Sequence, residues 1–118
     1  MQRPLTVQSR KAIYEEALKV MRAHYRENGL SLEQVARAVH ISKRHLQRVF
    51  QEAGGDGFRS TLRRIRMEAA KRRIAANPKL PTREVAEMVG YKQPSQFAKA
   101  FRSHVGVSLH EYRRRVAS

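Results

Sequence analysis

One pattern of residues occurs twice in this chain of 118 residues, over residues 32–50 and again over residues 82–101, where the second copy holds one extra residue. In both copies apolar residues recur every three to four positions, with a single break near the middle. That spacing predicts two short amphipathic helices joined by a tight turn, so the chain is expected to be all-α. The matched positions are Val35, Ala36, Val39, Ile41, Leu46 and Phe50 in the first copy and Val85, Ala86, Val89, Tyr91, Phe97 and Phe101 in the second.

The centre of each copy has the residues that a close helix crossing requires. Ala36 and Ala86 occupy the position where two steeply crossing helices come closest, which admits only a small side chain. Gly90 stands at the turn of the second copy, where positive φ is expected, and His40 stands there in the first. Histidine is among the residues enriched at positive φ, so it is tolerable there. Each copy is therefore interpreted as a helix-turn-helix, the motif that places its second helix in the major groove of DNA.

Three further helices complete a predicted total of seven. An amphipathic helix is expected from about Ser9 to Glu27, and a last short one includes Tyr112. Between the motifs, a long basic helix is expected from about Phe58 to Ala76, with its Lys and Arg residues away from its apolar face. The predicted organisation is a first helix-turn-helix subdomain over residues 1–57, a connecting helix over residues 58–77 and a second helix-turn-helix subdomain over residues 78–118.

The charge balance narrows the class of partner. Lys and Arg number 25 against 10 Asp and Glu, a formal net charge of +15. A polyanion offsets such an excess most simply, although charge alone leaves DNA, RNA and anionic membranes open. There is no apolar run of about 18 residues and no signal-peptide stretch, so the protein is expected in the cytoplasm without a membrane partner. The absence of cysteine excludes disulfides and cysteine-ligated zinc.

No group of residues has the spacing of a catalytic or metal site. The five histidines form no HxxxH or similar ligand pair. Glu15 and Glu16 are adjacent, so their side chains diverge on a helix and cannot act as a catalytic couple. No Gly-rich phosphate loop or nucleotide-binding motif is present. The chain is therefore expected not to be an enzyme and to need no metal or cofactor.

The outward face of the second helix in the first motif carries side chains suited to reading base pairs. Arg44, Gln47 and Arg48 lie at i, i+3 and i+4 and so share one face, opposite the apolar stripe. Arg can donate two parallel hydrogen bonds to guanine O6 and N7, and Gln can pair with adenine N6 and N7. These three residues are predicted to read bases. Contacts to phosphates, which position a protein without reading sequence, are predicted for Ser42, Lys43, Lys92 and Arg102.

Three segments, taken in their order, carry a resemblance to a known family. They are SKRHLQRVF beginning at Ser42, LRRIRMEAAKRRI beginning at Leu62 and VAEMVGYKQPSQFAKAFRSHVGVSLHEYR beginning at Val85. With them the chain resembles, from about Ser9 to Arg115, the DNA-binding domain of AraC/XylS-type bacterial transcription regulators, in particular the short two-motif members. The resemblance implies a seven-helix domain in which one long helix connects two helix-turn-helix subdomains, with no metal or cofactor.

The resemblance also carries base-reading positions onto the second motif. It places them at Pro94, Ser95, Ala98 and Lys99. Pro94 and Ala98 have no hydrogen-bonding side chain, so the second motif is expected to read fewer bases directly and to depend on Ser95, Gln96 and Lys99. The chain departs from the family at two places, where His40 replaces the usual turn glycine and Gly57 replaces a common helix-capping serine.

The function expected from these features is sequence-specific binding of double-stranded DNA by a transcription regulator, an activator, that inserts two reading helices into successive major grooves of an asymmetric site. A nonspecific architectural DNA-binding protein is one alternative, which explains the charge but not the hydrogen-bonding faces of the duplicated motifs. A module that binds an acidic partner, such as a subunit of RNA polymerase, is another. If the chain is complete, a monomer on DNA is expected. If it is the C-terminal part of a longer regulator, the rest is expected to sense a small molecule and to dimerise.

Overall fold

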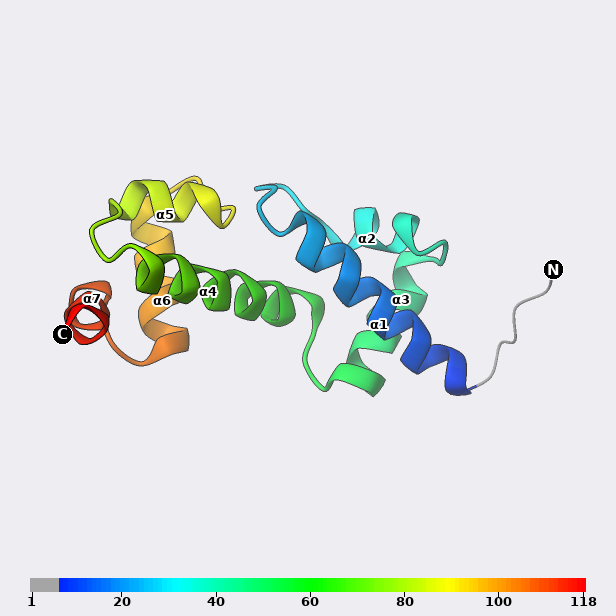
Figure 1. The fold of residues 1–118 in the computed structure, drawn as a ribbon. Helices are drawn as coiled ribbons and strands as arrows, with labels where there is room; N and C mark the ends of the chain where they lie inside the picture. The colour runs from blue at the N-terminus through cyan, green and yellow to red at the C-terminus, as the bar shows by residue number, and fades with distance from the viewer. Residues whose placement is uncertain (1–6) are drawn as a thin grey trace. The chain divides into compact units, whose positions relative to one another are not determined.

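The computed structural model describes residues 7–118, which form helices and connecting turns (Figure 1). Over that range the predicted all-α fold with seven α-helices is confirmed, and a π-helical segment, η1, is added to it. None of the described helices has both the length and the apolar character needed to cross a membrane. The elements are α1 (Val7–His24), α2 (Leu32–Ala38), α3 (Lys43–Val49), η1 (Phe50–Gly54), α4 (Phe58–Ala76), α5 (Thr82–Met88), α6 (Pro94–Val105) and α7 (Leu109–Ala117).

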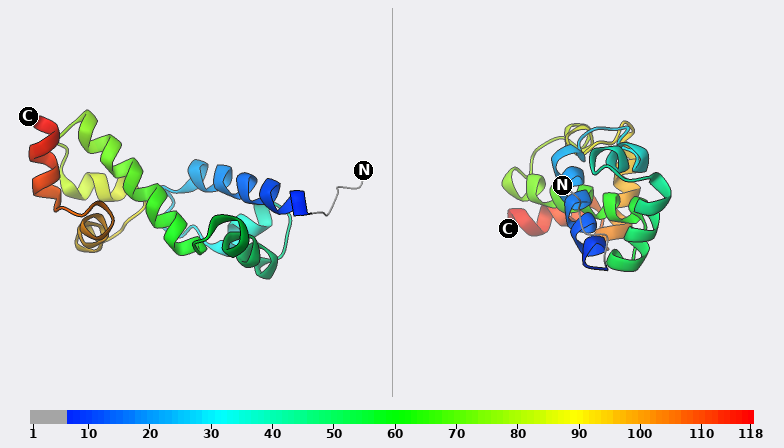
Figure 2. Two further views of the ribbon diagram at one scale, coloured as in Figure 1. Left: turned by 90° about the horizontal axis from the view of Figure 1, so that it is seen from below. Right: turned by 90° about the vertical axis from the view of Figure 1, so that its right-hand side faces the viewer.

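The chain forms two compact units, neither of which is continuous in sequence. The first unit comprises the described residues up to His24 together with Leu30–Leu62, and the second comprises Tyr25–Gly29 together with Arg63–Ser118. The chain therefore passes from one unit to the other three times. Helix α4 is uninterrupted in every view (Figure 2), and its first turn belongs to the first unit while the rest belongs to the second.

The first unit is built on a small apolar core in which α1 packs against α2, α3 and η1. Phe50 lies at its centre and is fully buried. Its ring makes edge-to-face contacts with Tyr14, at 5.5 Å between centroids, and with Phe58, at 5.9 Å. The other buried apolar residues of this unit are Ile13, Ala17, Leu18, Met21, Leu30, Val35, Ala36, Leu46, Val49 and Leu62.

The second unit has its own apolar core, in which α5 packs on α6 and α6 on α7. A row of aromatic rings runs through it, from Tyr91 to Phe97, Phe101 and Tyr112, with centroids 5.4 to 6.0 Å apart between neighbours. Phe97 and Phe101 are fully buried, as the apolar stripe of the second motif predicts. The remaining buried residues of this core are Met67, Ala69, Ala70, Ile74, Val85, Ala86 and Val89.

The turns of the two motifs share one hydrogen-bond pattern, which is that of a Schellman helix end. The residue at positive φ is His40 in the first turn (φ 63°) and Gly90 in the second (φ 93°), which confirms both positions predicted from the sequence. The first turn has bonds from Ile41 N to Ala36 O (3.1 Å) and from His40 N to Arg37 O (3.2 Å), and the second has bonds from Tyr91 N to Ala86 O (2.8 Å) and from Gly90 N to Glu87 O (3.2 Å).

Two details of the predicted helices are wrong, and both involve one buried cation. Helix α1 ends at His24, three residues before the predicted end at Glu27. Arg66 on α4 is only 9% exposed, although the sequence predicts that the Lys and Arg residues of this helix lie away from its apolar face. The guanidinium of Arg66 donates to the carbonyl oxygens of Tyr25 (2.9 Å) and Glu27 (2.8 Å). These carbonyls are therefore used in a tertiary contact instead of a further helical turn.

The π-helical segment η1 extends α3 and was not predicted by the repeat. It ends at Gly55, whose φ of 79° stops the helix. A Cβ atom added at Gly54 would lie 2.7 Å from the ring of Tyr14, so glycine at this position lets the aromatic ring of α1 approach the backbone of η1. The glycines after the first motif thus have separate roles, one in conformation and one in packing.

Three glycine substitutions in the second unit are expected to separate the cost of positive φ from the cost of crowding. Gly29→Ala, with no atom within 4 Å of the added Cβ, should change the free energy of unfolding little. Gly106→Ala, which is equally open but has φ of 93°, should lower it by about 1 kcal/mol. Gly90→Ala has the same φ and also places the Cβ 2.6 Å from the carbonyl oxygen of Tyr25, so it should lower it by about 3 kcal/mol.

Urea titrations monitored by circular dichroism give the three values on one scale. Equal losses for Gly90→Ala and Gly106→Ala would contradict an energetic role for the contact at Gly90.

Candidate nucleic-acid interface

Helix α3 is held at its first turn by a serine cap. The Ser42 backbone is extended, with φ −74° and ψ 157°, and its Oγ accepts a hydrogen bond from the N–H of His45 at 3.0 Å. Such a cap satisfies one of the unpaired N–H groups at the start of the helix. Ser42, one of the residues predicted to contact phosphate, is exposed in this position and sits next to the remaining N–H groups of the first turn.

The two sides of α3 differ sharply in burial. Leu46 and Val49 are at most 1% exposed and point into the first unit. Arg44, Gln47 and Arg48, the three predicted base-reading residues, are all exposed. The structure therefore places them together on the solvent side of the helix, where two guanidinium groups and one amide are available to a ligand.

Lys43 lies beside this face and has only a loose partner. Its Nζ is 3.9 Å from Oε2 of Glu33 on α2, and both side chains are more than half exposed. An exposed ion pair at that distance contributes little free energy, so the ammonium group remains available to a phosphate. This agrees with a role in positioning, which stays a prediction.

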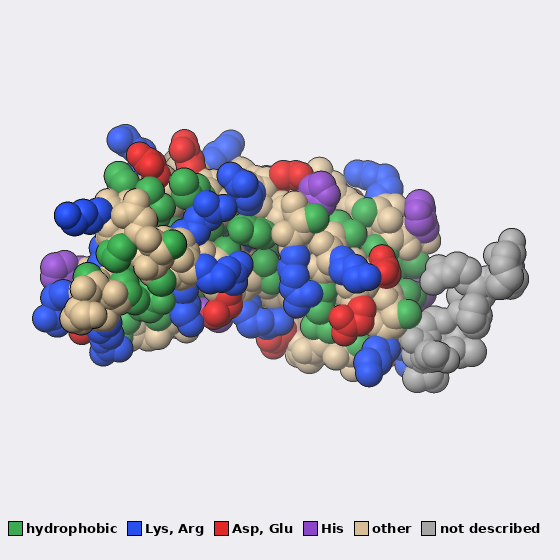
Figure 3. All heavy atoms as spheres, viewed as in Figure 1, with side chains coloured by type: hydrophobic (Ala, Val, Ile, Leu, Met, Phe, Trp, Pro, Cys, Tyr) green, Lys and Arg blue, Asp and Glu red, His purple; other side chains and the backbone are tan. Residues whose placement is uncertain are grey.

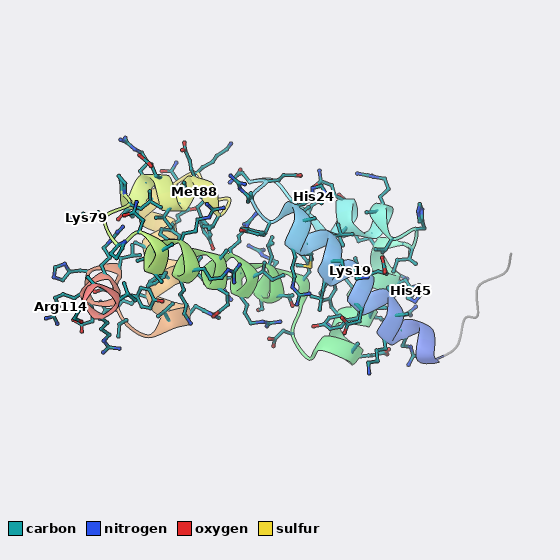
Figure 4. All side chains as sticks on the ribbon, in the orientation of Figure 1. Lys19, His24, His45, Lys79, Met88 and Arg114 are labelled. Carbon is teal, nitrogen blue, oxygen red and sulfur yellow. The ribbon has the colours of Figure 1, made fainter. Side chains whose placement is uncertain are left out.

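A polar pocket adjoins the far end of the α3 face, and the sequence pattern did not predict it. It has a volume of about 260 Å³ and is lined by Arg10, His45, Arg48, Val49 and Glu52. His45, labelled in Figure 4, is half-buried here. Arg10 on α1 forms an ion pair with Glu52 at 3.2 Å. Glu52 lies one helical turn after Arg48, so the carboxylate nearest to Arg48 in the sequence is paired with another cation. The sequence gives little indication of this pocket, because Arg10 and Glu52 lie in separate elements that are far apart in the chain.

Helix α6 is the corresponding helix of the second unit. It begins at Pro94, whose missing N–H would be unpaired at this position in any case, and the preceding Gln93 gives no side-chain cap. Phe97 and Phe101 are buried on one side. The predicted base-reading residues Ser95, Gln96 and Lys99 are exposed on the other. Lys92 and Arg102, which were predicted to contact phosphate, are exposed before and on α6 respectively.

Two side-chain contacts hold the second motif in place. On α7, Arg113 donates to the carbonyl oxygen of Pro78 at 2.6 Å and to Oγ1 of Thr82 at 3.1 Å, so it secures the start of α5, which has no side-chain cap. Glu68 on α4 is hydrogen-bonded to Nε2 of His104 on α6 at 3.1 Å. The hydrogen bond with His104 holds the pKa of the Glu68 carboxyl below its usual value.

Arg114, which follows Arg113 on α7 and is labelled in Figure 4, has a different role from that of Arg113. It and Arg115 both bind the carboxylate of Glu111, and these hydrogen bonds lower the pKa of that carboxyl. The three side chains form a local network on α7 itself. Arg113 therefore forms a hydrogen bond to another helix, α5, whereas Arg114 and Arg115 form hydrogen bonds within α7.

The charge of the surface fits an anionic ligand. Lys and Arg side chains are distributed over the visible faces of both units, with fewer Asp and Glu side chains among them (Figure 3). Each unit also has a helix with an exposed polar side, α3 or α6, and each such helix is the second of a helix-turn-helix. This combination defines a double-motif DNA-binding protein.

A family model described as a helix-turn-helix domain matches residues 35–115, most of the chain. The chain belongs to this family, the AraC-type DNA-binding domains, whose members are regulators of transcription and not enzymes. The resemblance inferred from the sequence is thereby confirmed.

Particular relatives agree with this assignment. The chain is 36% identical over 92 residues to the HTH-type transcriptional regulator GlxA of Rhizobium meliloti, covering 78% of this chain and 28% of that protein. It is 30% identical over 99 residues to the lactose operon transcription activator of Staphylococcus xylosus, covering 84% and 35%. The C-terminal domain of AraT, a response regulator from Geobacillus stearothermophilus, has a TM-score of 0.80 at 35% identity, covering 87% of this chain and 84% of that one. The chain spans about a third of the length of these two curated relatives.

Proposed function

We propose that this chain binds a specific, asymmetric site in double-stranded DNA by inserting α3 and α6 into successive major grooves, and that it thereby activates transcription. The observation that supports the proposal most directly is the burial pattern of these two helices. On each, the apolar stripe faces a core and the hydrogen-bonding residues face solvent. The two helices are called the reading helices below.

The chemistry of α3 suits recognition of guanine and adenine. Arg44 and Arg48 present planar guanidinium groups one turn apart, each able to bind O6 and N7 of a guanine through two N–H donors. Gln47 lies between them and offers the donor and acceptor pair that matches adenine. Ser42 and Lys43 lie at the N-terminal end of the same helix, where phosphate contacts set the register of a reading helix.

Helix α6 offers a different set of groups. Ser95 and Gln96 lie in its first turn and Lys99 in its second, with no arginine among them. A lysine binds as a point charge with rotatable donors and does not form the fork of an arginine. The half-site contacted by α6 is therefore expected to differ in sequence from the half-site contacted by α3, which makes the whole site asymmetric.

The partners and site of action follow from the same proposal. In this proposal, one DNA site is occupied by one chain as a monomer. The bound chain contacts RNA polymerase, and this contact increases transcription. The activator among the relatives described above supports the direction of regulation. Binding to chromosomal DNA places the protein on the nucleoid.

Nonspecific, architectural DNA binding is the competing function, supported by the net charge of +15. Titration of a selected site and of bulk DNA at two salt concentrations distinguishes the two. A specificity ratio above about 10³ supports regulation, and a lower ratio supports the architectural function. The site for this titration comes from selection of bound sequences out of a random DNA pool.

Arg44→Ala and Arg48→Ala are each expected to lose about 1–3 kcal/mol of discrimination at one or two base pairs of one half-site, because each removes a two-bond contact to guanine. Competition binding with single base-pair variants of the site measures the loss. An equal loss of affinity on cognate and scrambled DNA would assign these arginines to phosphates instead.

Lys43→Ala and Lys92→Ala are expected to weaken binding to all sequences alike, because phosphate contacts carry no sequence information. The slope of log K against log salt should become shallower by about one phosphate for each variant. Lys19→Ala, which removes an exposed lysine of α1 paired with Glu16, is the control and should leave the slope unchanged. A base-specific loss in Lys43→Ala or Lys92→Ala would refute the phosphate assignment of that lysine.

The spacing of the half-sites is the third prediction from this function. Because one continuous helix, α4, links the motifs in the chain, the half-sites are expected about 10 bp apart on one face of the DNA, with one protein protecting about two turns. Inserting 5 bp between the half-sites should abolish specific binding, and footprinting detects this. A palindromic footprint that needs two proteins, or full tolerance of the insertion, would overturn the proposal.

A further inference from the structure

Arg66 is a buried cation in the second unit, with no part in the proposed contacts to DNA. Within the described residues, it and Thr61 are the polar side chains that fall in the buried class, and Arg66 is the charged one. Burial of an unpaired charge is costly, so the groups that surround this guanidinium must replace its water.

Three groups take that role. The Nε of Arg66 donates to the carbonyl oxygen of Tyr25 at 2.9 Å and its Nη2 donates to that of Glu27 at 2.8 Å. Its Cζ lies 5.6 Å from the centre of the Tyr91 ring, within the range of a cation–π contact. Burial raises the pKa of the Tyr91 phenol. Arg66 thus connects the segment Tyr25–Gly29 to the residue that ends the turn of the second motif.

The same segment contacts that turn directly. Nδ2 of Asn28 donates to the carbonyl oxygen of Gly90 at 2.9 Å. A Cβ atom on Gly90 would lie 2.6 Å from the Tyr25 oxygen and 2.9 Å from Nε of Arg66, so the backbone, the carbonyl and the guanidinium are already in contact. The turn between α5 and α6 is therefore covered on this side by Arg66 and Tyr25–Gly29, which we call the turn clamp.

The first motif provides an internal comparison. Its turn has the same hydrogen-bond pattern, but His40, which stands where Gly90 stands in the second turn, is exposed, whereas Gly90 is buried. The turn clamp is thus a feature of the second motif and not a requirement of the helix-turn-helix itself.

We propose that Arg66 is a positioning residue for DNA reading by α6: through the turn clamp it fixes Gly90 and Tyr91, and so the direction in which α6 leaves the turn. The inference rests on the proposed function of α6 as a reading helix. A reading helix must hold its side chains within a fraction of an ångström of the base edges, so a turn with freedom to move weakens discrimination even where every contacting residue is intact.

The first test uses the free protein and does not depend on DNA. Arg66→Met removes both hydrogen bonds to carbonyls but keeps an apolar stem, and Asn28→Ala removes only the hydrogen bond to the carbonyl oxygen of Gly90. Arg72→Met removes an exposed cation from the same helix and is the control of equal charge. Amide hydrogen exchange is compared at Tyr91, whose N–H bonds to Ala86, and at Ile41, the matching position of the first turn.

Arg66→Met is expected to lower protection of the Tyr91 amide by at least about tenfold, because it removes two hydrogen bonds from a charged group, without changing that of Ile41. Asn28→Ala should also lower protection of the Tyr91 amide, but by a smaller factor, and Arg72→Met should leave that protection unchanged. If Arg66→Met does not fold, protection of the Tyr91 amide in Asn28→Ala tests the turn clamp instead. Unchanged protection at Tyr91 in Arg66→Met, or in Asn28→Ala where Arg66→Met does not fold, would overturn the proposal, as would an equal loss at Tyr91 and Ile41.

The second test measures base discrimination under conditions where each variant is folded. Base pairs are assigned to α6 as those whose discrimination falls in Lys99→Ala. Arg66→Met should reduce discrimination at these pairs and leave unchanged the pairs that depend on Arg44, whereas a merely less stable protein would lose affinity for all sites alike. Equal effects at both sets of pairs would overturn the positioning role. If the wild-type protein shows no discrimination at all, the proposed function fails, and the exchange measurement still decides whether Arg66 fixes the turn.

Discussion

The contact between the backbone at Gly90 and the carbonyl oxygen of Tyr25 is the constraint on which the second unit depends. It leaves no space for a side chain at the turn, and it brings Arg66 close enough to bind that carbonyl and lie over Tyr91. The direction of α6 follows from this turn, because the helix begins three residues after Tyr91. The exposed residues of α6 therefore take their positions from a turn that is itself held by buried groups.

The two motifs show that the same local hydrogen bonds can have different surroundings. The first turn accepts His40 at positive φ, where a non-glycine residue is less favourable, and it stays exposed. The second turn requires glycine at position 90 for two reasons, because φ is positive there and because a Cβ atom would collide with the carbonyl oxygen of Tyr25. The two turns share one geometry within this chain, while the contacts that support that geometry differ between the copies.

Much of the fold could be predicted from the sequence because its determinants are local. The apolar spacing of each helix, the positive φ at His40 and Gly90 and the proline at the start of α6 are each encoded within a few residues. Arg66 could not be placed in this way, since its two acceptors lie 41 and 39 residues away in the chain. The ion pair of Arg10 and Glu52 escapes a pattern-based prediction for the same reason. The side of α3 and α6 that faces solvent was predictable, whereas which of their residues touch bases depends on a ligand and stays a prediction.

The division of the chain into interleaved units has a consequence for synthesis on the ribosome. Tyr25–Gly29 is synthesised before its partners Arg66 and Gly90, although all three belong to the same unit. During translation its carbonyl groups cannot bind Arg66 until some 40 further residues have been added, which takes a few seconds at typical rates. The first motif can mature while the second is still being made, so folding of this small domain is expected to be ordered in time from the N-terminus, with closure over Gly90 as a late step.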